Sequence, residues 1–384
     1  MSDPLAPLRK APGLVRIHGH RGARGVLPEN TLIGFRHCFD TGIEIVEIDV
    51  LMTADNIPVL THNPRLMAAA TRLDGRWLEG EGPAIRGLSL AALQAHDVGG
   101  LRPDTGYGGR YPDQAFLSGV CVPTLADLAA LVCTEPYADC WLNIEIKSNP
   151  AHPEHTPPIA DYVAGVMAVL IRFALENRVI VQSFDWRILK ELKRVAPEIP
   201  RSHLSYLDRE TPPMDPNILD GSEWMAGASR SDAGGSLPDL IADLGGAVWS
   251  PYHTDITAKE VARAQERGLI VNAWTVNTPE EINAAIDAGI DGLITDYPAR
   301  AQRLLLARGL SWRDPRAPAA TFSASSRRAA HLGEVAEHVD AFILDAFGVL
   351  NRGETAIPGA IDRMRELCDQ GKRLIVLTNA ASYT

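Results

Sequence analysis

Short apolar segments and longer amphipathic segments alternate along the chain up to about residue 309. The apolar segments are five to eight residues long and are bounded by polar or glycine-containing stretches. This pattern is typical of buried strands. It predicts eight strands, at residues 14–19, 44–50, 141–147, 178–184, 201–207, 247–252, 269–276 and 292–296.

The segments between these strands carry apolar residues at helical spacing. The segment 278–289 begins with Thr278, a good N-cap, and places a proline in its first turn, and the segment 29–42 ends at a glycine. These are ordinary start and stop signals of helices. Helices are therefore predicted at residues 29–42, 159–176, 185–197, 257–268, 278–289 and 298–309.

One pair of apolar segments breaks the alternation. Only the residues "LMTADNI" separate the strand at 44–50 from the apolar segment at 58–62. Parallel strands need a crossover of a dozen residues or more, so this segment is predicted to return as an antiparallel hairpin. Without the hairpin, about eight strand–helix units remain over about 300 residues, which predicts an α/β fold of the TIM (β/α)8 barrel type.

The composition changes after Gly309. Residues 311–335 begin with a stretch rich in Pro, Ala, Ser and Arg, which is typical of a linker. Residues 340–350, 358–371 and 373–380 then read as strand, helix and strand. One such Rossmann-like βαβ unit cannot bury both faces of its sheet, so we expect a truncated or otherwise completed domain. The predicted domains are a barrel at 1–310, a linker at 311–335 and a partial domain at 336–384.

Composition and charge exclude several classes of protein. The net charge of −11 and the lack of a basic stripe argue against a nucleic-acid partner. The five cysteines are scattered and lack a C-x-x-C pair, which argues against disulfides and structural zinc and favours a reducing cytoplasm. No secretory signal and no apolar stretch long enough for a bilayer are recognised. A cytoplasmic protein is expected, and a homo-oligomer stays open.

Carboxylates close the second and third predicted parallel strands. Glu47 and Asp49 end the second strand, and Glu145 ends the third. Side chains alternate along a strand, so Glu47 and Asp49 point to one side while Val46 and Ile48 point to the other. Barrel strands end at one mouth, where three carboxylates repel one another unless a cation lies between them. Oxygen ligands favour Mg²⁺, Ca²⁺ or Mn²⁺ over zinc.

Histidines flank this predicted metal site. His18 and His20 lie at the end of the first strand. If the hairpin turn centres on residues 55–56, Asp49 lies across from His62, within a residue or two. Because histidines titrate near neutral pH, His20 and His62 can serve as base and acid at phosphorus. A lone strand-end histidine is usually structural, and we interpret His18 in this way.

An isolated E-x-D pair is also most often a solvated strand face. The convergence of functional residue types on three strand ends favours the catalytic interpretation. The motifs then become recognisable, because they resemble the glycerophosphodiester phosphodiesterase family in that family's order over about residues 14–309. They are "HRGARGVLPENT", "EIDVLMTADNIPVLTH", "LNIEIK", "VQSF", "NAWTVN" and "GLITDYP".

The resemblance implies roles for individual residues. It makes His20 and His62 the general acid and base, and it assigns the divalent metal to Glu47, Asp49 and Glu145. It places Arg21 and Lys147 near the phosphate. The P-E-N motif maps to Glu29 and Asn30, and its glutamate, Glu29, is placed by the active site. Trp274 becomes a wall for the glycerol moiety. One departure is visible, since Asn63 stands where the family often has Asp.

The implied reaction is metal-dependent hydrolysis of a glycerophosphodiester to an alcohol and sn-glycerol 3-phosphate, in phospholipid and glycerol metabolism. In the family the glycerol 2-hydroxyl is thought to attack first, through a cyclic phosphate, and water second. Two alternatives stay open. One is a lysophospholipase-D-like hydrolase, which needs an apolar groove near the mouth. The other is a non-catalytic barrel that binds phosphodiesters, which has no need of both histidines.

The C-terminal segment carries a second resemblance. "ILDAFGVLNRG", "IPGA" and "LIVLTNAAS" resemble the start of haloacid-dehalogenase-like hydrolases of the p-nitrophenyl-phosphatase-like class, over about residues 340–382. The resemblance makes Asp345 the nucleophile and Thr378 a phosphate ligand. Phe347 stands where phosphatases of this class usually carry a second aspartate. The remaining site residues would lie beyond residue 384, so the piece is expected to be inactive as given.

Overall fold

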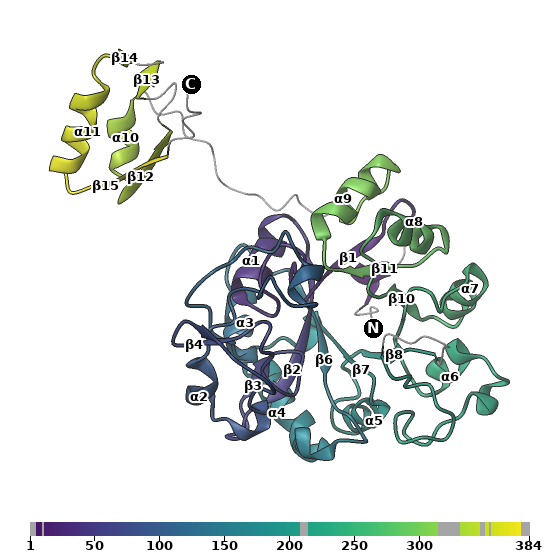
Figure 1. The fold of residues 1–384 in the computed structure, drawn as a ribbon. Helices are drawn as coiled ribbons and strands as arrows, with labels where there is room; N and C mark the ends of the chain where they lie inside the picture. Colours follow the sequence, from purple (N-terminus) through teal and green to yellow (C-terminus); the bar gives the residue numbers. More distant parts are fainter. Residues whose placement is uncertain are drawn as a thin grey trace. The chain divides into compact units, whose positions relative to one another are not determined.

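The computed structural model describes residues 5–9, 11–207, 214–313, 331–345, 350–352 and 355–377 (Figure 1). The chain forms two compact units, Met1–Ala320 and Thr321–Thr384. Most of the predicted linker, residues 314–330, lies outside the described residues. The domain limits given above therefore stay predictions, and each unit is described by itself.

The first unit is a closed barrel of eight parallel strands, which confirms the predicted TIM barrel (Figure 1). The barrel closes because β1 pairs in parallel with both β2 and β11. The eight strands are β1 (Arg16–His20), β2 (Ile45–Met52), β6 (Trp141–Ile146), β7 (Val179–Ser183), β8 (Arg201–Ser205), β9 (Val248–Pro251), β10 (Ile270–Ala273) and β11 (Gly292–Thr295).

Helices surround this barrel. Six lie where helical spacing predicts them: α1 (Leu32–Asp40), α4 (Ile159–Arg172), α5 (Trp186–Val195), α7 (Ala258–Glu266), α8 (Pro279–Asp287) and α9 (Pro298–Ala307). The pattern did not predict α3 (Leu125–Val132) and α6 (Leu237–Asp243), which have eight and seven residues. A helix of only two turns is too short for the helical spacing of its apolar residues to be recognised. Their capping signals are clear, since the Thr124 and Ser236 side chains accept hydrogen bonds from the first turns.

Strand β2 shows how the alternation of side chains builds both the core and the site. Its outward-facing Val46, Ile48 and Val50 are fully buried between the barrel and the helices. The side chains between them point into the barrel, where Glu47 and Asp49 lie. Apolar burial on one face therefore holds the carboxylates on the other face in position.

Ile48→Ala is expected to lower the free energy of unfolding by about 2–5 kcal/mol, because it leaves a cavity at a fully buried position. Denaturant unfolding followed by circular dichroism measures this loss. Ile33→Ala is the matched control, since Ile33 on α1 is 45% exposed and its truncation should change stability by only about 0.5 kcal/mol. Equal losses for the two variants would contradict the assigned core.

The predicted hairpin is present, but its register differs by one residue. Strand β3 (Pro58–Leu60) pairs antiparallel with the end of β2, with Val50 opposite Leu60. The Thr61 N–H donates to the Asp49 carbonyl at 3.0 Å, so Asp49 faces Thr61 rather than His62. The reason is a three-residue loop, 54–56, closed by Thr53 and ended by Asn56 at φ 60°. A two-residue loop had been expected, and a left-handed third residue is a common alternative.

The hairpin leads into a long excursion before α3. It contains β4 (Arg72–Leu73), β5 (Arg76–Trp77) and α2 (Leu90–Gln94). Its own apolar cluster packs on the hairpin and comprises Leu51, Val59, Leu66, Ile85, Leu93 and Val122. Six 3₁₀ turns complete the barrel unit among its described residues: Ala6–Leu8, Ile85–Gly87, Gly108–Arg110, η4 (Pro153–His155), Glu176–Arg178 and Arg230–Ala233.

The second unit contains the predicted βαβ element. Strands β12 (Ala341–Asp345) and β15 (Arg373–Leu377) pair in parallel and are joined through α11 (Ala360–Asp369). Ile343 and Ile375 are 66% and 52% exposed, as expected for a sheet covered on one face. The unit also contains α10 (Leu332–Ala336), β13 (Asn351–Arg352) and β14 (Thr355–Ala356). Among the helices described in the whole chain, none combines the length and apolar character needed to cross a membrane.

Candidate active site

The turn after β1 brings the first functional residues over the barrel mouth. His20 is the last residue of β1, and Arg21 and Gly22 follow with φ values of 50° and 86°. A Cβ on Gly22 would lie 2.9 Å from the carbonyl carbon of Gly34 in α1. Only glycine permits this close approach together with the positive φ. The turn therefore packs against α1 and directs Arg21 toward β2.

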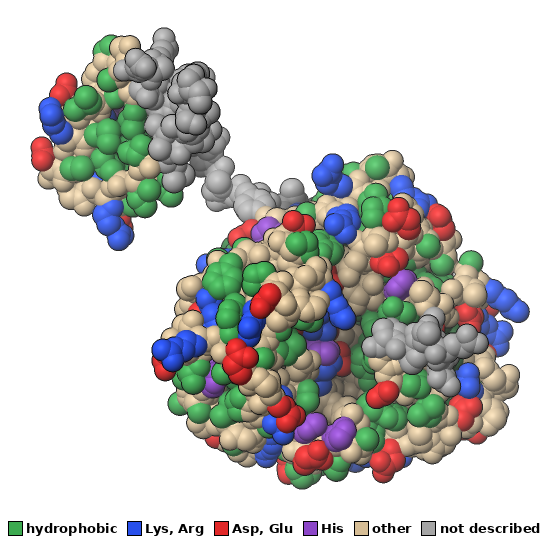
Figure 2. Space-filling model, viewed as in Figure 1, with side chains coloured by type: hydrophobic (Ala, Val, Ile, Leu, Met, Phe, Trp, Pro, Cys, Tyr) green, Lys and Arg blue, Asp and Glu red, His purple; other side chains and the backbone are tan. Residues whose placement is uncertain are grey.

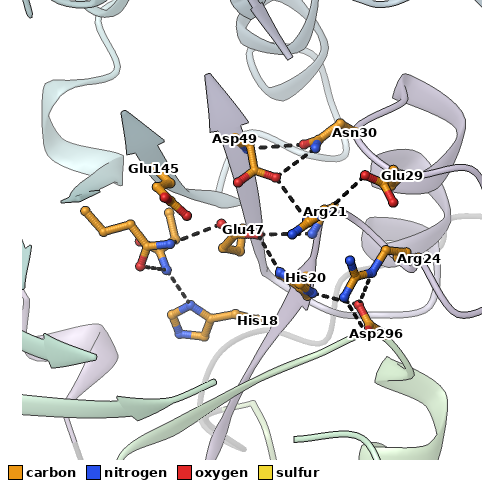
Figure 3. Close-up of polar contacts among 12 residues, drawn as sticks. His18, His20, Arg21, Arg24, Glu29, Asn30, Glu47, Asp49, Glu145 and Asp296 are labelled. Carbon is orange, nitrogen blue, oxygen red and sulfur yellow. Dashed lines mark hydrogen bonds and ion pairs between the residues drawn. The ribbon is translucent and has the colours of Figure 1, made fainter. Parts of the chain in front are cut away.

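The three predicted metal ligands lie together. In the parallel register Asp49 of β2 is the partner of Glu145 of β6, and Glu47 lies two residues earlier on the same face. One carboxylate oxygen from each of the three residues lies within 4.8 Å of the others, and all three side chains are buried (Figure 3). This cluster, hereafter the acidic cluster, is the convergence that the strand ends predicted.

Burial and mutual repulsion divide the charge unequally within the acidic cluster. Burial, together with the negative charges of Asp49 and Glu145, raises the pKa of Glu47 well above its usual range. Burial acts the same way on Asp49, but the Lys147 ammonium and the Arg21 guanidinium outweigh it and hold the pKa of Asp49 well below its usual range. The pKa of Glu145 is raised, chiefly by burial.

Lys147 binds two members of the acidic cluster. Its Nζ lies 2.7 Å from Glu145 Oε1 and 3.1 Å from Asp49 Oδ1. The donor set consists of oxygens only, and with all three carboxylates ionised it carries more negative charge than one ammonium and one guanidinium neutralise. Such a set suits a hard divalent cation. The acidic cluster can therefore hold a divalent metal, with Lys147 beside it.

Arg21 is held from two sides (Figure 3). Its Nε lies 3.1 Å from Asp49 Oδ2, and its Nη1 lies 3.0 Å from Glu29 Oε1. Asn30, with φ 54°, donates from Nδ2 to Asp49 Oδ2 at 2.9 Å and accepts the Asp49 N–H at 3.2 Å. The Tyr107 hydroxyl donates to the other Glu29 oxygen. Glu29 and Asn30 thus position Arg21 and Asp49.

His20 lies between the acidic cluster and an aspartate that the sequence analysis missed. Its Nε2 lies 3.8 Å from Glu47 Oε2, and its Nδ1 lies 2.7 Å from Asp296 Oδ1. Arg24 donates to both oxygens of Asp296, at 2.8 and 2.9 Å. Burial, reinforced by the Arg24 charge, lowers the pKa of His20 to about 4 against the opposing effect of Asp296.

His62 reaches the same cavity from the hairpin. Its Nδ1 lies 2.5 Å from Asn63 Oδ1, so the amide that replaces the usual aspartate still contacts the ring. Burial, together with the positive charges of Arg21 and Lys147, lowers the pKa of His62 well below its usual value. Both predicted acid–base histidines are therefore favoured in their neutral forms in the metal-free protein.

A cavity of about 510 Å³ opens over these groups. Figure 2 shows it as a hollow in the barrel unit. Its polar lining includes His20, Arg21, His62, Glu145 and Lys147. Its apolar lining includes Phe184, Leu204, Met214, Trp224 and Trp274, which are hereafter called the aromatic wall. The Trp274 ring is held by an Nε1–H bond to the Ser250 carbonyl at 2.8 Å and by an edge contact with Phe184. The structure thus places Trp274 in the cavity wall.

Residues 20–300 match the glycerophosphoryl diester phosphodiesterase family. A protein of Bacillus subtilis, the uncharacterised YqiK, is 30% identical over 297 residues, which is 76% of this chain and 99% of that protein. The chain belongs to the glycerophosphoryl diester phosphodiesterase family. It is accordingly an enzyme of the phosphoric diester hydrolase class.

Two further relatives support this family assignment. The glycerophosphodiester phosphodiesterase of Caldanaerobacter subterraneus subsp. tengcongensis is 27% identical over 283 residues, covering 73% of this chain and 93% of that protein. A crystal structure from Silicibacter pomeroyi, of a protein assigned as a glycerophosphoryl diester phosphodiesterase, is 43% identical. It has a TM-score of 0.71 and covers 80% of this chain and 99% of that one. In the second unit, residues 342–384 match haloacid-dehalogenase-like hydrolases, as the motifs indicated.

Several residues of this phosphodiesterase family site escaped the sequence analysis. Asp296 directly follows the last residue of β11 in "GLITD", so the search for carboxylates at strand ends that identified Glu47 could have found it. Gln182, which donates to Glu47 Oε1 at 3.1 Å, lies on the barrel-facing side of β7 and gives a weaker signal. In the aromatic wall, Phe184 and Trp274 lie in the motifs "VQSF" and "NAWTVN", whereas Leu204, Met214 and Trp224 gave no signal. His18 is 1% exposed, and burial lowers its pKa to about 3, which suits the structural interpretation.

The candidate residues of the second unit are only partly described. Asp345 is the last residue of β12, opposite Leu377 of β15, and its side chain is exposed. Thr378 and Phe347 lie outside the described residues. The roles that the haloacid-dehalogenase resemblance gives Asp345 and Thr378 therefore stay predictions, as does the expected inactivity of this unit.

Proposed function

We propose that the barrel hydrolyses small glycerophosphodiesters to an alcohol and sn-glycerol 3-phosphate, with Mg²⁺, Ca²⁺ or Mn²⁺ in the acidic cluster. One observation carries the proposal. Three carboxylates, two cationic side chains and two histidines converge on one cavity, and the family relationship supplies the reaction. The metal, bound by Glu47, Asp49 and Glu145, would supply positive charge to the phosphoryl oxygens.

The chain's own residues account for the remaining roles. Arg21 and Lys147 lie where they can bind the phosphate oxygens and stabilise the charge that develops on them. One of the two histidines, His20 or His62, takes the proton of the attacking hydroxyl, and the other gives a proton to the departing alkoxide. Each needs an unprotonated ring nitrogen at some step, which their lowered pKa values favour. Trp274 offers an apolar surface to the glycerol carbons.

Asp296 acts as a positioning residue in this scheme. Its contact with Nδ1 of His20 keeps the hydrogen of that ring on Nδ1 and leaves Nε2, which faces Glu47, free to exchange a proton. Asp296→Asn is expected to lower kcat by about 10–100-fold with little change in KM, because orientation rather than substrate contact is lost. Steady-state release of glycerol 3-phosphate measures both constants. A change confined to KM would contradict the assigned role.

The aromatic wall favours one alternative, a lysophospholipase-D-like activity. No apolar groove was recognisable in the sequence, whereas the cavity lining includes the apolar side chains Phe184, Leu204, Met214, Trp224 and Trp274. Rates with glycerophosphocholine and with monomeric short-chain lysophosphatidylcholine decide between the two. A higher kcat/KM for glycerophosphocholine supports the proposed function, and the reverse order supports the alternative.

A panel of glycerophosphodiesters tests the proposal as a whole. Enzymatic detection of glycerol 3-phosphate after incubation with headgroups of different size and charge defines the substrate. No release from any member, by folded protein supplied with each of the three metals, would favour the non-catalytic barrel. The cytoplasmic location, the metabolic setting and a homo-oligomer stay predictions.

A further inference from the structure

A short turn at the rim of the cavity carries a second group of metal-ligating residues. It follows β6 and contains η4 (Pro153–His155), with His152 at its N-cap. In a 3₁₀ turn residues three apart eclipse each other, so His152 and His155 lie on one face. Their rings stack with centroids 5.1 Å apart and an interplanar angle of 21°. Glu154 lies between them in the chain.

The backbone of this turn is fixed by local hydrogen bonds. The His152 N–H donates to the Asn149 carbonyl at 3.0 Å, and the His155 N–H donates to the His152 carbonyl at 3.1 Å. The Ala151 N–H donates to Asn149 Oδ1 at 2.9 Å. Pro153 fixes its own φ at the first position of the turn. The relative placement of the three side chains therefore depends little on the rest of the loop.

The spacing of the ligand atoms matches a tetrahedral metal site. His152 Nδ1 lies 3.2 Å and His155 Nε2 lies 3.6 Å from the same oxygen, Glu154 Oε1. Metal–ligand bonds of about 2.1 Å at tetrahedral angles place ligand atoms about 3.4 Å apart. One potential ligand atom from each of the three residues lies within 4.8 Å of the others. Each imidazole nitrogen binds a metal in the plane of its ring, so rotation of the His152 and His155 side chains out of their stacked arrangement would be needed to bring both nitrogens onto one ion.

We propose that His152, Glu154 and His155 form a second metal site, the rim site, which takes a transition metal of the zinc class. Two imidazole nitrogens and one carboxylate are ligands that Zn²⁺, Co²⁺ and Ni²⁺ prefer, whereas the all-oxygen acidic cluster prefers harder ions. The two sites therefore select different metals. The inference rests on the rim residues alone and does not depend on the proposed reaction.

The rim site is positioned so that its metal ion would contact a ligand that enters the cavity. Three protein ligands leave a tetrahedral ion at least one open position. His152 and His155 both line the cavity, together with Lys147 and His62. Figure 2 shows histidine side chains at the edge of this hollow. A divalent ion held by one carboxylate and two neutral imidazoles carries a net positive charge, so the rim site would attract an anionic group to the cavity mouth.

Zinc binding to the untagged full-length chain tests the proposal. Isothermal titration with Zn²⁺, in saturating Mg²⁺, is expected to show one tight site in wild-type protein. His152→Ala/His155→Ala should weaken it by at least about tenfold. All three residues are at least partly exposed, so the variants should fold, which thermal unfolding checks. His37→Ala is the matched control, because His37 is partly buried on α1 and lies outside this cavity.

A second variant separates the rim site from the acidic cluster. Glu145→Gln removes an acidic-cluster ligand and is expected to leave the tight Zn²⁺ site unchanged. With Co²⁺ as probe, the visible absorption of the bound ion should persist in Glu145→Gln and disappear in His155→Ala. The proposal is overturned if wild-type protein shows no tight Zn²⁺ site, if the double variant binds Zn²⁺ as wild type does, or if Glu145→Gln abolishes binding.

Discussion

Replacing His62 by alanine is expected to lower kcat/KM for glycerophosphodiester hydrolysis by about 10²–10⁴-fold, the usual contribution of a positioned proton-transfer group. His62 follows β3, the antiparallel partner of β2, by two residues and lines the cavity together with Lys147. The other described histidines of the cavity, His20, His152 and His155, lie on other elements of the barrel unit, so none of them occupies the position of His62. Release of glycerol 3-phosphate under single-turnover conditions measures the loss without interference from product release.

Two controls make the His62 experiment specific. His37→Ala changes a partly buried histidine on α1, outside the cavity, and should leave the rate unchanged. Asn63→Asp restores the charge that the family often has at this position and should change the rate by far less than the loss of His62. If His62→Ala is as fast as wild type, the acid–base scheme fails, although the metal site could still stand.

The sequence was sufficient for the acidic cluster because simple geometry determines it. Side chains two apart on a strand share a face, so Glu47 and Asp49 had to point the same way. Parallel barrel strands end at one mouth, which brought Glu145 to them. The one-residue register error did not remove His62 from the site, because His62 lies two residues beyond β3, in a bend where strand alternation no longer sets the direction of the side chain. Because Val46 and Ile48 are buried on the face of β2 that packs against the helices, Glu47 and Asp49 point into the barrel.

Other parts of the site depend on contacts that no local pattern encodes. His20 and Asp296 are 276 residues apart and meet only because β11 closes the barrel against β1. Tyr107 reaches Glu29 from the long excursion after the hairpin, where no helical or strand period identified the structure. The aromatic wall combines Phe184, Trp224 and Trp274, which follow different strands. Their convergence is a property of the closed barrel rather than of any segment.

Removal of the divalent metal is expected to abolish most activity, by at least about 10²-fold, since a cation at the phosphoryl oxygens contributes several kcal/mol. Exhaustive dialysis against EDTA, followed by addition of Mg²⁺, Ca²⁺ or Mn²⁺ singly, measures both the loss and the metal preference. Full activity after dialysis would contradict the proposed role of the acidic cluster, provided that elemental analysis shows no retained metal.

Replacing Glu47 by glutamine tests the role of the metal without a chelator. It removes one ligand, so activity should fall by a comparable factor, and added metal should no longer raise the melting temperature as it does for wild-type protein. The metal-free stability should change little, because Glu47 is the member of the acidic cluster whose ionised form burial and its neighbours disfavour most. A variant that loses activity while keeping its metal-free stability locates the defect in metal binding. A variant that unfolds would instead show that Glu47 is needed for the barrel itself.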